Sequence, residues 1–274
     1  MFKIVRVKEI VDKKMNAPKH KIGVFDSGIG GFSVLNELLK VFPEAEYFYY
    51  SDDAHAPYGP KTDEYITQRT FVITDELISK GAEMIVVACN TATASSIDAL
   101  RTTYPQMPFV GVEPYLNAYY KESGPSKMAV LTTVSTGKSE RFRRLKERLD
   151  PKGFIDHYSL KNLARMVEEL YRHPDYEAEF DKLLVEELEP LQGQNYTHAI
   201  LGCTHYPLVK EKIESVLKLK TLYPDPYVAG RVRELTVRPN EVLTPGSDTF
   251  NFYSSSKPEW VKKNRSDFYY PFKK

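Results

Sequence analysis

Short apolar runs alternate along the chain with segments whose apolar residues recur at helical spacing. KIGVF (21–25) and MIVVA (84–88) are short and rich in aliphatic residues, which is typical of buried strands. FSVLNELLKVF (32–42) has helical spacing, as has segment 63–80, which Gly81 is expected to end as a C-cap. This alternation predicts βαβ units, and therefore an α/β fold whose mostly parallel sheets carry helices on both faces.

A second series of the same kind follows residue 115, so the sequence predicts two α/β halves. The first comprises residues 20–114 and about 226–274, and the second comprises residues 115–225. Residues 1–19 form a basic N-terminal extension, and the aromatic tail at 250–272 is expected to dock. The remaining expected strands are 45–50, 108–112, 127–133, 153–159 and 198–202, and further expected helices are 95–104, 138–149 and 207–217.

Composition narrows the classes of function. The chain has 274 residues, of which 42% are apolar, enough to bury a substantial core. Its 38 Lys and Arg residues balance 37 Asp and Glu residues, so no nucleic-acid partner is expected. A basic patch at 138–149 is better explained as a solvated helix, because Phe142, Leu145 and Leu149 recur at helical spacing.

The sequence indicates neither a membrane nor an oxidising compartment. No apolar run approaches the roughly 18 residues of a membrane helix, and the N-terminus lacks the apolar core of a secretory signal. Cys89 and Cys203 are too few for a disulfide scaffold or a cysteine-based zinc site, so no metal is expected. We therefore expect a cytoplasmic protein with reduced thiols and no membrane partner.

Chemically active residues follow the predicted strands at four places. They are Asp26 in DSG, Cys89 in ACNT, the TTVST segment that starts at Thr132, and Cys203 in GCTH. In open α/β sheets, ligands bind outside the carboxyl ends of the strands. If the two halves face each other, the two cysteines line one cleft from opposite sides. Such thiols could invert a carbon centre, one removing a proton and the other returning a proton to the far face.

The neighbouring residues suit this two-base chemistry. Both cysteines directly precede a predicted helix, and the positive end of a helix lowers the pKa of a thiol. His205 could relay a proton for Cys203, and Asp26 could do the same in the other half. Short polar side chains near both cysteines are suited to binding carboxylate and ammonium groups, namely Ser27, Asn90, Thr91 and Thr204.

Other interpretations of these residues stay open. The cysteines could be small buried core residues, Asp26 could be a helix N-cap, and His205 could bond a backbone carbonyl. DSGIGG could be a tight turn or an anion-binding loop. GIGGFS, followed by Asp52 and Asp53, also partly matches a dinucleotide-binding motif, but Ser33 occupies the place where that motif needs Gly or Ala.

Five motifs between Ile22 and Val209 resemble those of glutamate racemases, in the aspartate/glutamate racemase superfamily. They are FDSGIGGFSVL, APYGPKT, VVACNTATA, GVEP and LGCTHYPLV, in the order of that family. The resemblance implies two pseudosymmetric α/β domains with the active site in the cleft between them. It also implies a cytoplasmic, cofactor-independent isomerase that makes D-glutamate for peptidoglycan, and hence for cell-wall biogenesis and cell shape. Because the family often forms dimers, a homodimer is a candidate assembly.

The resemblance also assigns roles to residues of this chain. It implies that Cys89 deprotonates D-glutamate and that Cys203 deprotonates L-glutamate. Glu168 falls where an assisting glutamate is expected, although Arg165 stands where the family commonly has proline. The residues that match substrate contacts are Asp26, Ser27, Tyr58, Gly59, Asn90, Thr91, Thr133, Thr136, Thr204 and His205. A racemase for another amino acid, such as aspartate, and a catalytically idle binding protein are the alternatives.

Overall fold

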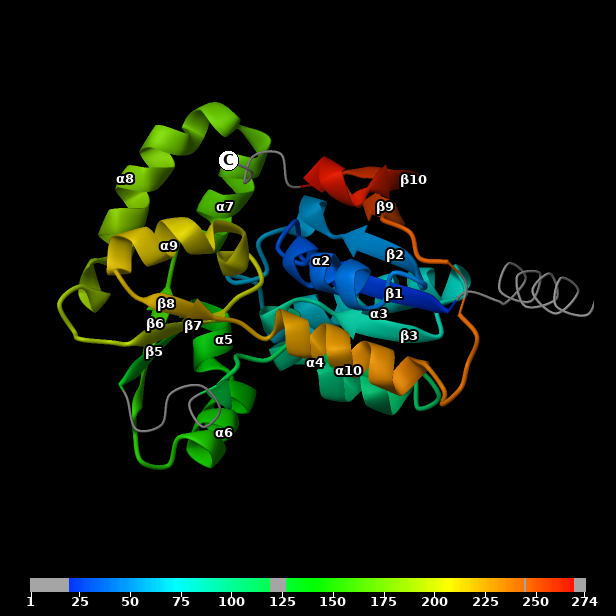
Figure 1. Cartoon of the computed structure of the whole chain (residues 1–274), viewed down its shortest axis with the longest axis horizontal. Coiled ribbons are helices and arrows are strands. Elements are labelled where there is room, and N and C mark those ends of the chain that lie inside the picture. The colour runs from blue at the N-terminus through cyan, green and yellow to red at the C-terminus, as the bar shows by residue number, and fades with distance from the viewer. Residues whose placement is uncertain (1–19, 119–126, 244, 269–274) are drawn as a thin grey trace, which may run out of the picture.

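Two sheets, each with helices on both faces, make up the described part of the chain. The computed structural model describes residues 20–118, 127–243 and 245–268, which form two α/β halves side by side (Figure 1). The predicted N-terminal extension, residues 1–19, and the end of the aromatic tail lie outside the described residues. None of the helices in the described ranges is long and apolar enough to cross a membrane.

The first sheet has the strand order β10-β9-β2-β1-β3-β4, and its described strands are parallel except β10. Side chains alternate between its faces, as strand geometry requires: Ile22 and Val24 enter one apolar cluster and Phe25 another. Burial on both faces explains the nearly continuous apolar runs in the sequence. The strands are β1 Lys21–Asp26, β2 Glu46–Ser51, β3 Met84–Val87, β4 Phe109–Gly111, β9 Thr249–Ser254 and β10 Lys257–Asn264.

The second sheet is wholly parallel among the described residues and repeats the order of the first. Its order β6-β5-β7-β8 matches β2-β1-β3-β4, so the two halves are pseudosymmetric. In both sheets the order reverses beside the strand that comes first in sequence. That reversal is where open α/β sheets bind ligands. The strands are β5 Met128–Thr133, β6 Ile155–Leu160, β7 His198–Gly202 and β8 Lys220–Leu222.

Helices cover both faces of each sheet, and one apolar cluster joins the halves. α2 and α10 pack together on one face of the first sheet, and α3 and α4 pack on the other. The cluster beneath α2 and α10 continues into α7, α8 and α9 of the second half. The helices are α2 Phe32–Val41, α3 Asp63–Ser79, α4 Asn90–Thr103, α5 Val134–Lys138, α6 Glu140–Leu149, α7 Leu163–Arg172, α8 Glu177–Leu188, α9 Lys210–Leu217 and α10 Asp225–Thr236.

Two predicted helices differ from those observed. The helix expected at 95–104 already begins at Asn90, because the polar residues ahead of it form its first turns. The helix expected at 138–149 begins only at Glu140, because Lys138 ends the short helix α5 and Ser139 caps α6 by accepting a hydrogen bond from the Phe142 amide. In both cases the polar side chains fold into the helix end, which apolar periodicity alone does not reveal.

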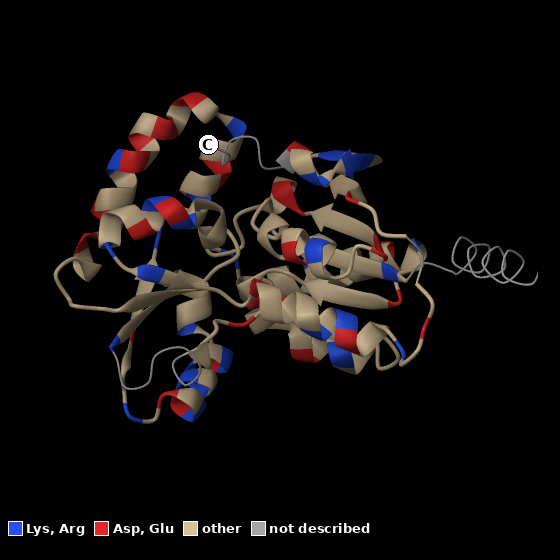
Figure 2. Cartoon of the chain, in the orientation of Figure 1, with Lys and Arg blue, Asp and Glu red and all other residues tan. Residues whose placement is uncertain are grey.

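The basic patch on α6 is a solvated helix. Phe142 and Leu145 are buried, while Arg143 and Arg144 form ion pairs with Glu140. Positive and negative side chains are interspersed along the helices of both halves (Figure 2). The aromatic C-terminal segment, as far as Asn264, forms the β9–β10 hairpin that extends the first sheet beside β2.

Candidate active site

The carboxyl ends of the central strands bring both cysteines to the junction of the two halves. Asp26 ends β1, Cys89 follows the adjacent β3, and Cys203 follows β7. Both cysteines are free, and their residues are only 5% and 6% exposed. The loop after β1 contacts both segments: the Ser27 hydroxyl lies 3.8 Å from Cys89 Sγ, and Asp26 Oδ2 lies 3.0 Å from the hydroxyl of Thr204, the neighbour of Cys203.

Cys89 caps helix α4. Its Sγ accepts a hydrogen bond from the Ala92 amide at 3.4 Å and lies 3.8 Å from the Ser27 hydroxyl. Burial nevertheless raises the pKa of the Cys89 thiol, and the negative charges of Asp26 and Cys203 raise it further. The prediction of a lowered pKa at this helix end is therefore wrong, because desolvation outweighs the helix end. Burial therefore favours the neutral thiol of Cys89 over its thiolate.

Cys203 does not stand at the start of an α-helix, contrary to the prediction. A 3₁₀ helix, Tyr206–Val209, follows it, and α9 begins only at Lys210. The physical reason is Pro207, which lacks the N–H that an α-helical turn would donate to the Cys203 carbonyl. That carbonyl instead accepts from the Tyr206 amide at 3.1 Å. The environment of Cys203 is therefore set by side chains and not by a helix end.

A buried chain of polar contacts extends from Cys203. Its Sγ lies 3.7 Å from His205 Nδ1, and His205 Nε2 lies 2.8 Å from Glu168 Oε1. Burial opposes the charge on His205, but the contacts with Cys203 and Glu168 outweigh it and raise the pKa of His205 well above its ordinary value. Burial likewise opposes the charge on Glu168, yet His205, the Ile29 amide and Arg172 lower its pKa. These contacts favour a protonated His205 between Cys203 and an ionised Glu168.

Asp26 is bonded to both halves. Its Oδ1 accepts from the Gly28 amide at 2.9 Å and its Oδ2 from the Thr204 hydroxyl at 3.0 Å. Burial raises the pKa of Asp26 to about 6, although the positive charge of His205 partly offsets this effect. The N-cap interpretation of Asp26 is wrong, since α2 begins after Gly31. Asp26 is a buried acid that can change its protonation near neutral pH.

The glycines of DSGIGG permit close contact between the halves. A Cβ atom on Gly28 would overlap Glu168 Oε1, and one on Gly30 would overlap the His205 ring. The Ile29 amide between them donates to Glu168 Oε1 at 2.9 Å. The loop therefore packs on protein side chains, and a dinucleotide phosphate would have to displace them.

The residues that made a dinucleotide site conceivable have structural partners. Asp52 accepts from the Arg69 guanidinium at 2.7 Å and from the Tyr58 hydroxyl at 2.6 Å. Asp53 accepts from the Ser254 hydroxyl at 2.8 Å. Ser33, which breaks the motif, donates to the Thr204 carbonyl at 3.1 Å. The dinucleotide interpretation is therefore disfavoured.

Three threonines meet across the junction. Thr91 Oγ1 of the first half lies 3.1 Å from Thr133 Oγ1 and 3.3 Å from Thr136 Oγ1 of the second. Beside them, the Asn90 amide donates to the Val112 carbonyl at 3.3 Å, which fixes the orientation of that side chain. Hydroxyl groups of both halves thus lie together where a carboxylate could be held.

Tyr58 and Gly59 differ in their surroundings. The Tyr58 side chain is buried, and its hydroxyl is bonded to Asp52, so this group is not free for a substrate. A Cβ atom on Gly59 would meet nothing within 4 Å. What this loop can offer to a ligand is its backbone amide groups.

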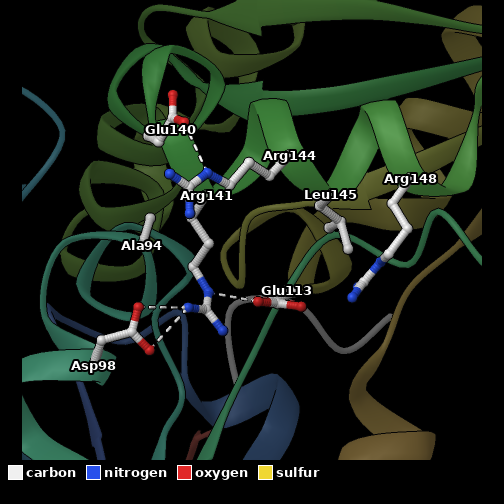
Figure 3. Close-up of a pocket in the computed structure, with 8 residues that line it drawn as sticks. All are labelled: Ala94, Asp98, Glu113, Glu140, Arg141, Arg144, Leu145 and Arg148. Atoms are coloured by element: carbon white, nitrogen blue, oxygen red, sulfur yellow. Dashed lines mark hydrogen bonds and ion pairs between the residues drawn. The ribbon is translucent and has the colours of Figure 1, made fainter. Parts of the chain in front are cut away.

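Arg141 forms a second bridge between the halves. From α6 it makes ion pairs with Asp98 on α4 and with Glu113, which lies between the two sheets in sequence (Figure 3). A cavity of about 380 Å³ lies beside this bridge, lined also by Arg144 and Arg148. Among the described residues, no group of three or more His, Cys, Asp or Glu side chains is placed to hold a metal ion.

Comparison with known proteins assigns this arrangement to a family. The family model for Asp/Glu/Hydantoin racemase matches residues 27–229. The chain belongs to this racemase family. It is 35% identical over 241 residues to the glutamate racemase of Stutzerimonas stutzeri, covering 87% of this chain and 89% of that protein. The resemblance inferred from the motifs is thereby confirmed.

Solved structures of racemases confirm the α/β fold class. The Escherichia coli glutamate racemase, in complex with L-glutamate and the activator UDP-MurNAc-Ala, aligns with a TM-score of 0.78 at 25% identity, covering 93% of this chain and 94% of that one. A glutamate racemase of Bacillus anthracis aligns with a TM-score of 0.72 at 26% identity and covers 86% of each chain.

The motifs missed several residues that contact the candidate site or bridge the two halves. The Ile29 amide contributes only its backbone, which no side-chain pattern reveals. Arg172 pairs with Glu168 at 3.5 Å, and their i,i+4 spacing on a helix was the available signal. Arg141 was seen only as part of a basic patch. The roles of the residues that the motifs did select stay predictions.

Proposed function

We propose that this chain is a glutamate racemase that interconverts L- and D-glutamate by proton transfer between two thiols, without a cofactor. The observation that carries the proposal is the matched placement of Cys89 and Cys203 after corresponding strands of two pseudosymmetric halves. Relatives with the name glutamate racemase, 35–38% identical over most of the chain, support this substrate.

The two thiols have complementary roles in this mechanism. In the L-to-D direction, the Cys203 thiolate takes the α-proton of L-glutamate, and the electron pair stays on the substrate as a carbanion. The Cys89 thiol then donates its proton to the opposite face, which leaves D-glutamate, a Cys203 thiol and a Cys89 thiolate. The neutral resting state of Cys89 suits it for the donor role in this direction. Each positioned acid or base contributes about 10²–10⁴-fold.

Buried acids and bases support each thiol. We assign Asp26, whose pKa is about 6, to the Cys89 side, because its charge raises the pKa of Cys89. We assign His205, held by Glu168, to the Cys203 side, where its imidazolium lies 3.7 Å from Cys203 Sγ and would stabilise the thiolate. Proton exchange with Asp26 and His205 would return Cys89 and Cys203 to their starting protonation states for the next turnover.

Short polar groups around the thiols would hold the substrate. Hydroxyl and amide groups suit its two carboxylates and its ammonium group, and the site carries them on both halves. Tyr58 and Gly59 would contribute through backbone amides, since the Tyr58 hydroxyl is occupied. The proposed substrate contacts are Asp26, Ser27, Tyr58, Gly59, Asn90, Thr91, Thr133, Thr136, Thr204 and His205.

The product would be D-glutamate for peptidoglycan synthesis. A cytoplasmic location is proposed, supported by two free cysteines, since thiols stay reduced there. A homodimer stays a prediction, to be tested by light scattering. The substrate alternative is aspartate, because the same polar groups could hold a shorter diacid.

A D/L assay on purified protein, with glutamate and aspartate as separate substrates and no added pyridoxal phosphate, tests the function. We expect racemisation of glutamate at a kcat/KM at least about 100-fold above that for aspartate, since one methylene displaces the second carboxylate from its partners. Treatment with borohydride should not abolish activity. Inactivity with both amino acids, or a required Schiff base, would overturn the proposal.

A further inference from the structure

The two oxygens of Glu168 have unequal surroundings. Oε1 receives both the contact from His205 Nε2, at 2.8 Å, and the hydrogen bond from the Ile29 amide, at 2.9 Å. Oε2 is buried and has no hydrogen-bond partner. Arg172 Nη2 lies 3.5 Å from Oε2 and forms an ion pair with it. Oε1 thus contacts His205 and the Ile29 amide, whereas the interaction of Oε2 is the ion pair with Arg172.

The Arg172 guanidinium is the cation of this pair, and it lies at the solvent-exposed edge of the site. It lies one turn after Glu168 on α7, and its side chain is 46% exposed, against 6% for Glu168. Both residues line a cavity of about 460 Å³ that also borders the β9–β10 hairpin. The guanidinium therefore stands at the outer end of the series Cys203, His205, Glu168, Arg172.

We propose that Arg172 is a positioning residue of the racemase, whose guanidinium keeps Glu168 ionised and directed at His205 and so keeps the Cys203 side of the site competent. The inference rests on the proposed racemase function. Without this cation, Oε2 would be a buried carboxylate oxygen with no hydrogen bond, and the carboxylate would face only the His205 imidazolium at Oε1 among the cations described beside it. Glu168 would then bind a proton more readily, and a neutral Glu168 holds the His205 imidazolium less well.

Other charged and titratable groups around Glu168 do not replace Arg172. On the elements packed against Glu168, the titratable groups other than His205 are carboxylic acids or phenols. Across the cavity that Glu168 and Arg172 line, positive and negative side chains are mixed. The neighbours are Asp26, Tyr49, Tyr171 and His205, and the groups across the cavity are Asp53, Lys257, Glu259, Lys263 and Asp267.

Three variants on one helix test the proposal. Arg172→Gln removes the charge, Arg172→Lys retains it, and Arg165→Gln removes an equivalent charge from an exposed position beside a different cavity. We expect Arg172→Gln to move the acidic limb of the kcat/KM profile for glutamate up by about one pH unit, as removal of a nearby charge does, so that kcat/KM falls about tenfold at pH values on that limb. Arg172→Lys should restore most of the loss, and Arg165→Gln should behave as wild type.

Isotope effects identify which side of the site is affected. The enantiomers are equally stable, so kcat/KM is the same in both directions for every variant. If proton transfer to and from Cys203 is slowed, however, removal of the α-proton limits the rate more with L-glutamate and less with D-glutamate. The isotope effect of α-deuterium on kcat/KM should therefore increase with L-glutamate and decrease with D-glutamate. A general loss of structure would not move the two effects in opposite directions.

A measurement without turnover separates this inference from the proposed function. The ring resonances of His205 in the intact protein, followed by NMR against pH, should report protonation of Glu168 at a higher pH in Arg172→Gln than in wild type. An unchanged His205 titration, or an acidic limb in Arg172→Gln that matches that of Arg165→Gln, would overturn the role of Arg172. A wild-type protein inactive on glutamate would instead overturn the proposed function.

Discussion

The Thr204 hydroxyl donates a hydrogen bond of 3.0 Å to Asp26 Oδ2, which joins residues 178 positions apart in sequence. Thr204 belongs to the Cys203 side of the site and Asp26 to the Cys89 side. The protonation of Asp26, in the first half, therefore depends on where the second half places Thr204. This hydrogen bond lowers the pKa of Asp26, but burial of the carboxyl outweighs it and raises the pKa to about 6.

Asp26→Asn should lower kcat by about 100-fold while KM changes less, because proton transfer belongs to the transition state. The amide can still accept from the Gly28 amide and donate to Thr204, so the fold should be retained. Steady-state kinetics measure the effect. A variant with wild-type kcat would limit Asp26 to a structural role.

The same substitution should stabilise the folded protein at neutral pH. The pKa of Asp26 is about 6 when folded, against an ordinary 3.8, so folding takes up a proton in this window and stability falls as pH rises through it. Above pH 6 the penalty is complete, on the order of 3 kcal/mol for two pKa units. Denaturant unfolding should therefore show Asp26→Asn more stable than wild type at pH 7.5 and similar at pH 4. Lower stability at pH 7.5 would contradict the assignment.

Cys89→Ala and Cys203→Ala should each abolish racemisation, since each removes the proton carrier of one face. Their losses should not add in the double variant, because residues that act as a unit are not additive. In D₂O, the wild-type product should carry α-deuterium while the remaining substrate gains little at early times. Racemisation by either alanine variant would rule out the two-thiol mechanism.

Alkylation should reveal the raised pKa of Cys89. Because burial disfavours the thiolate, iodoacetamide should label Cys89 slowly at neutral pH, and its rate should still be rising above pH 9. Glutamate should protect the residue, and mass spectrometry of the labelled peptide measures both effects. In unfolded protein the rate should level off near the ordinary thiol pKa of about 8.5. A plateau near pH 7 in the folded protein would show that Cys89 is a thiolate at rest.

Gly28→Ala should lower kcat/KM by about 100-fold, because the new Cβ would displace Glu168 from the Ile29 amide and a displacement of about 1 Å can cost that much. Gly230→Ala is the matched control, as its Cβ would meet nothing within 4 Å. It lies inside α10 and should stabilise the protein by about 0.5–1 kcal/mol with unchanged activity. Equal kinetics for the two variants would remove any role for the close approach at Gly28.

The α/β class and the residue types at the strand ends could be predicted from local sequence patterns. Apolar runs such as Met84–Val87 are buried on both faces of a parallel sheet, so a continuous apolar run in the sequence is sufficient to predict such a strand. The motifs around Cys89 and Cys203 were sufficient for the family, because a strand end and the residues that follow it are local in sequence. Pro207 also carried a local signal, and it explains why no α-helix starts at Cys203.

The ionisation of those residues, and the need for glycine in the loop after β1, depend on contacts between segments that are distant in sequence. The pKa of Cys89 depends on burial and on the charges of Asp26 and Cys203, which distant segments bring to it. The need for Gly28 arises from Glu168, 140 residues later in the chain. Desolvation and steric overlap depend on distances in space. A sequence pattern identifies the residues involved but does not give the distances between them.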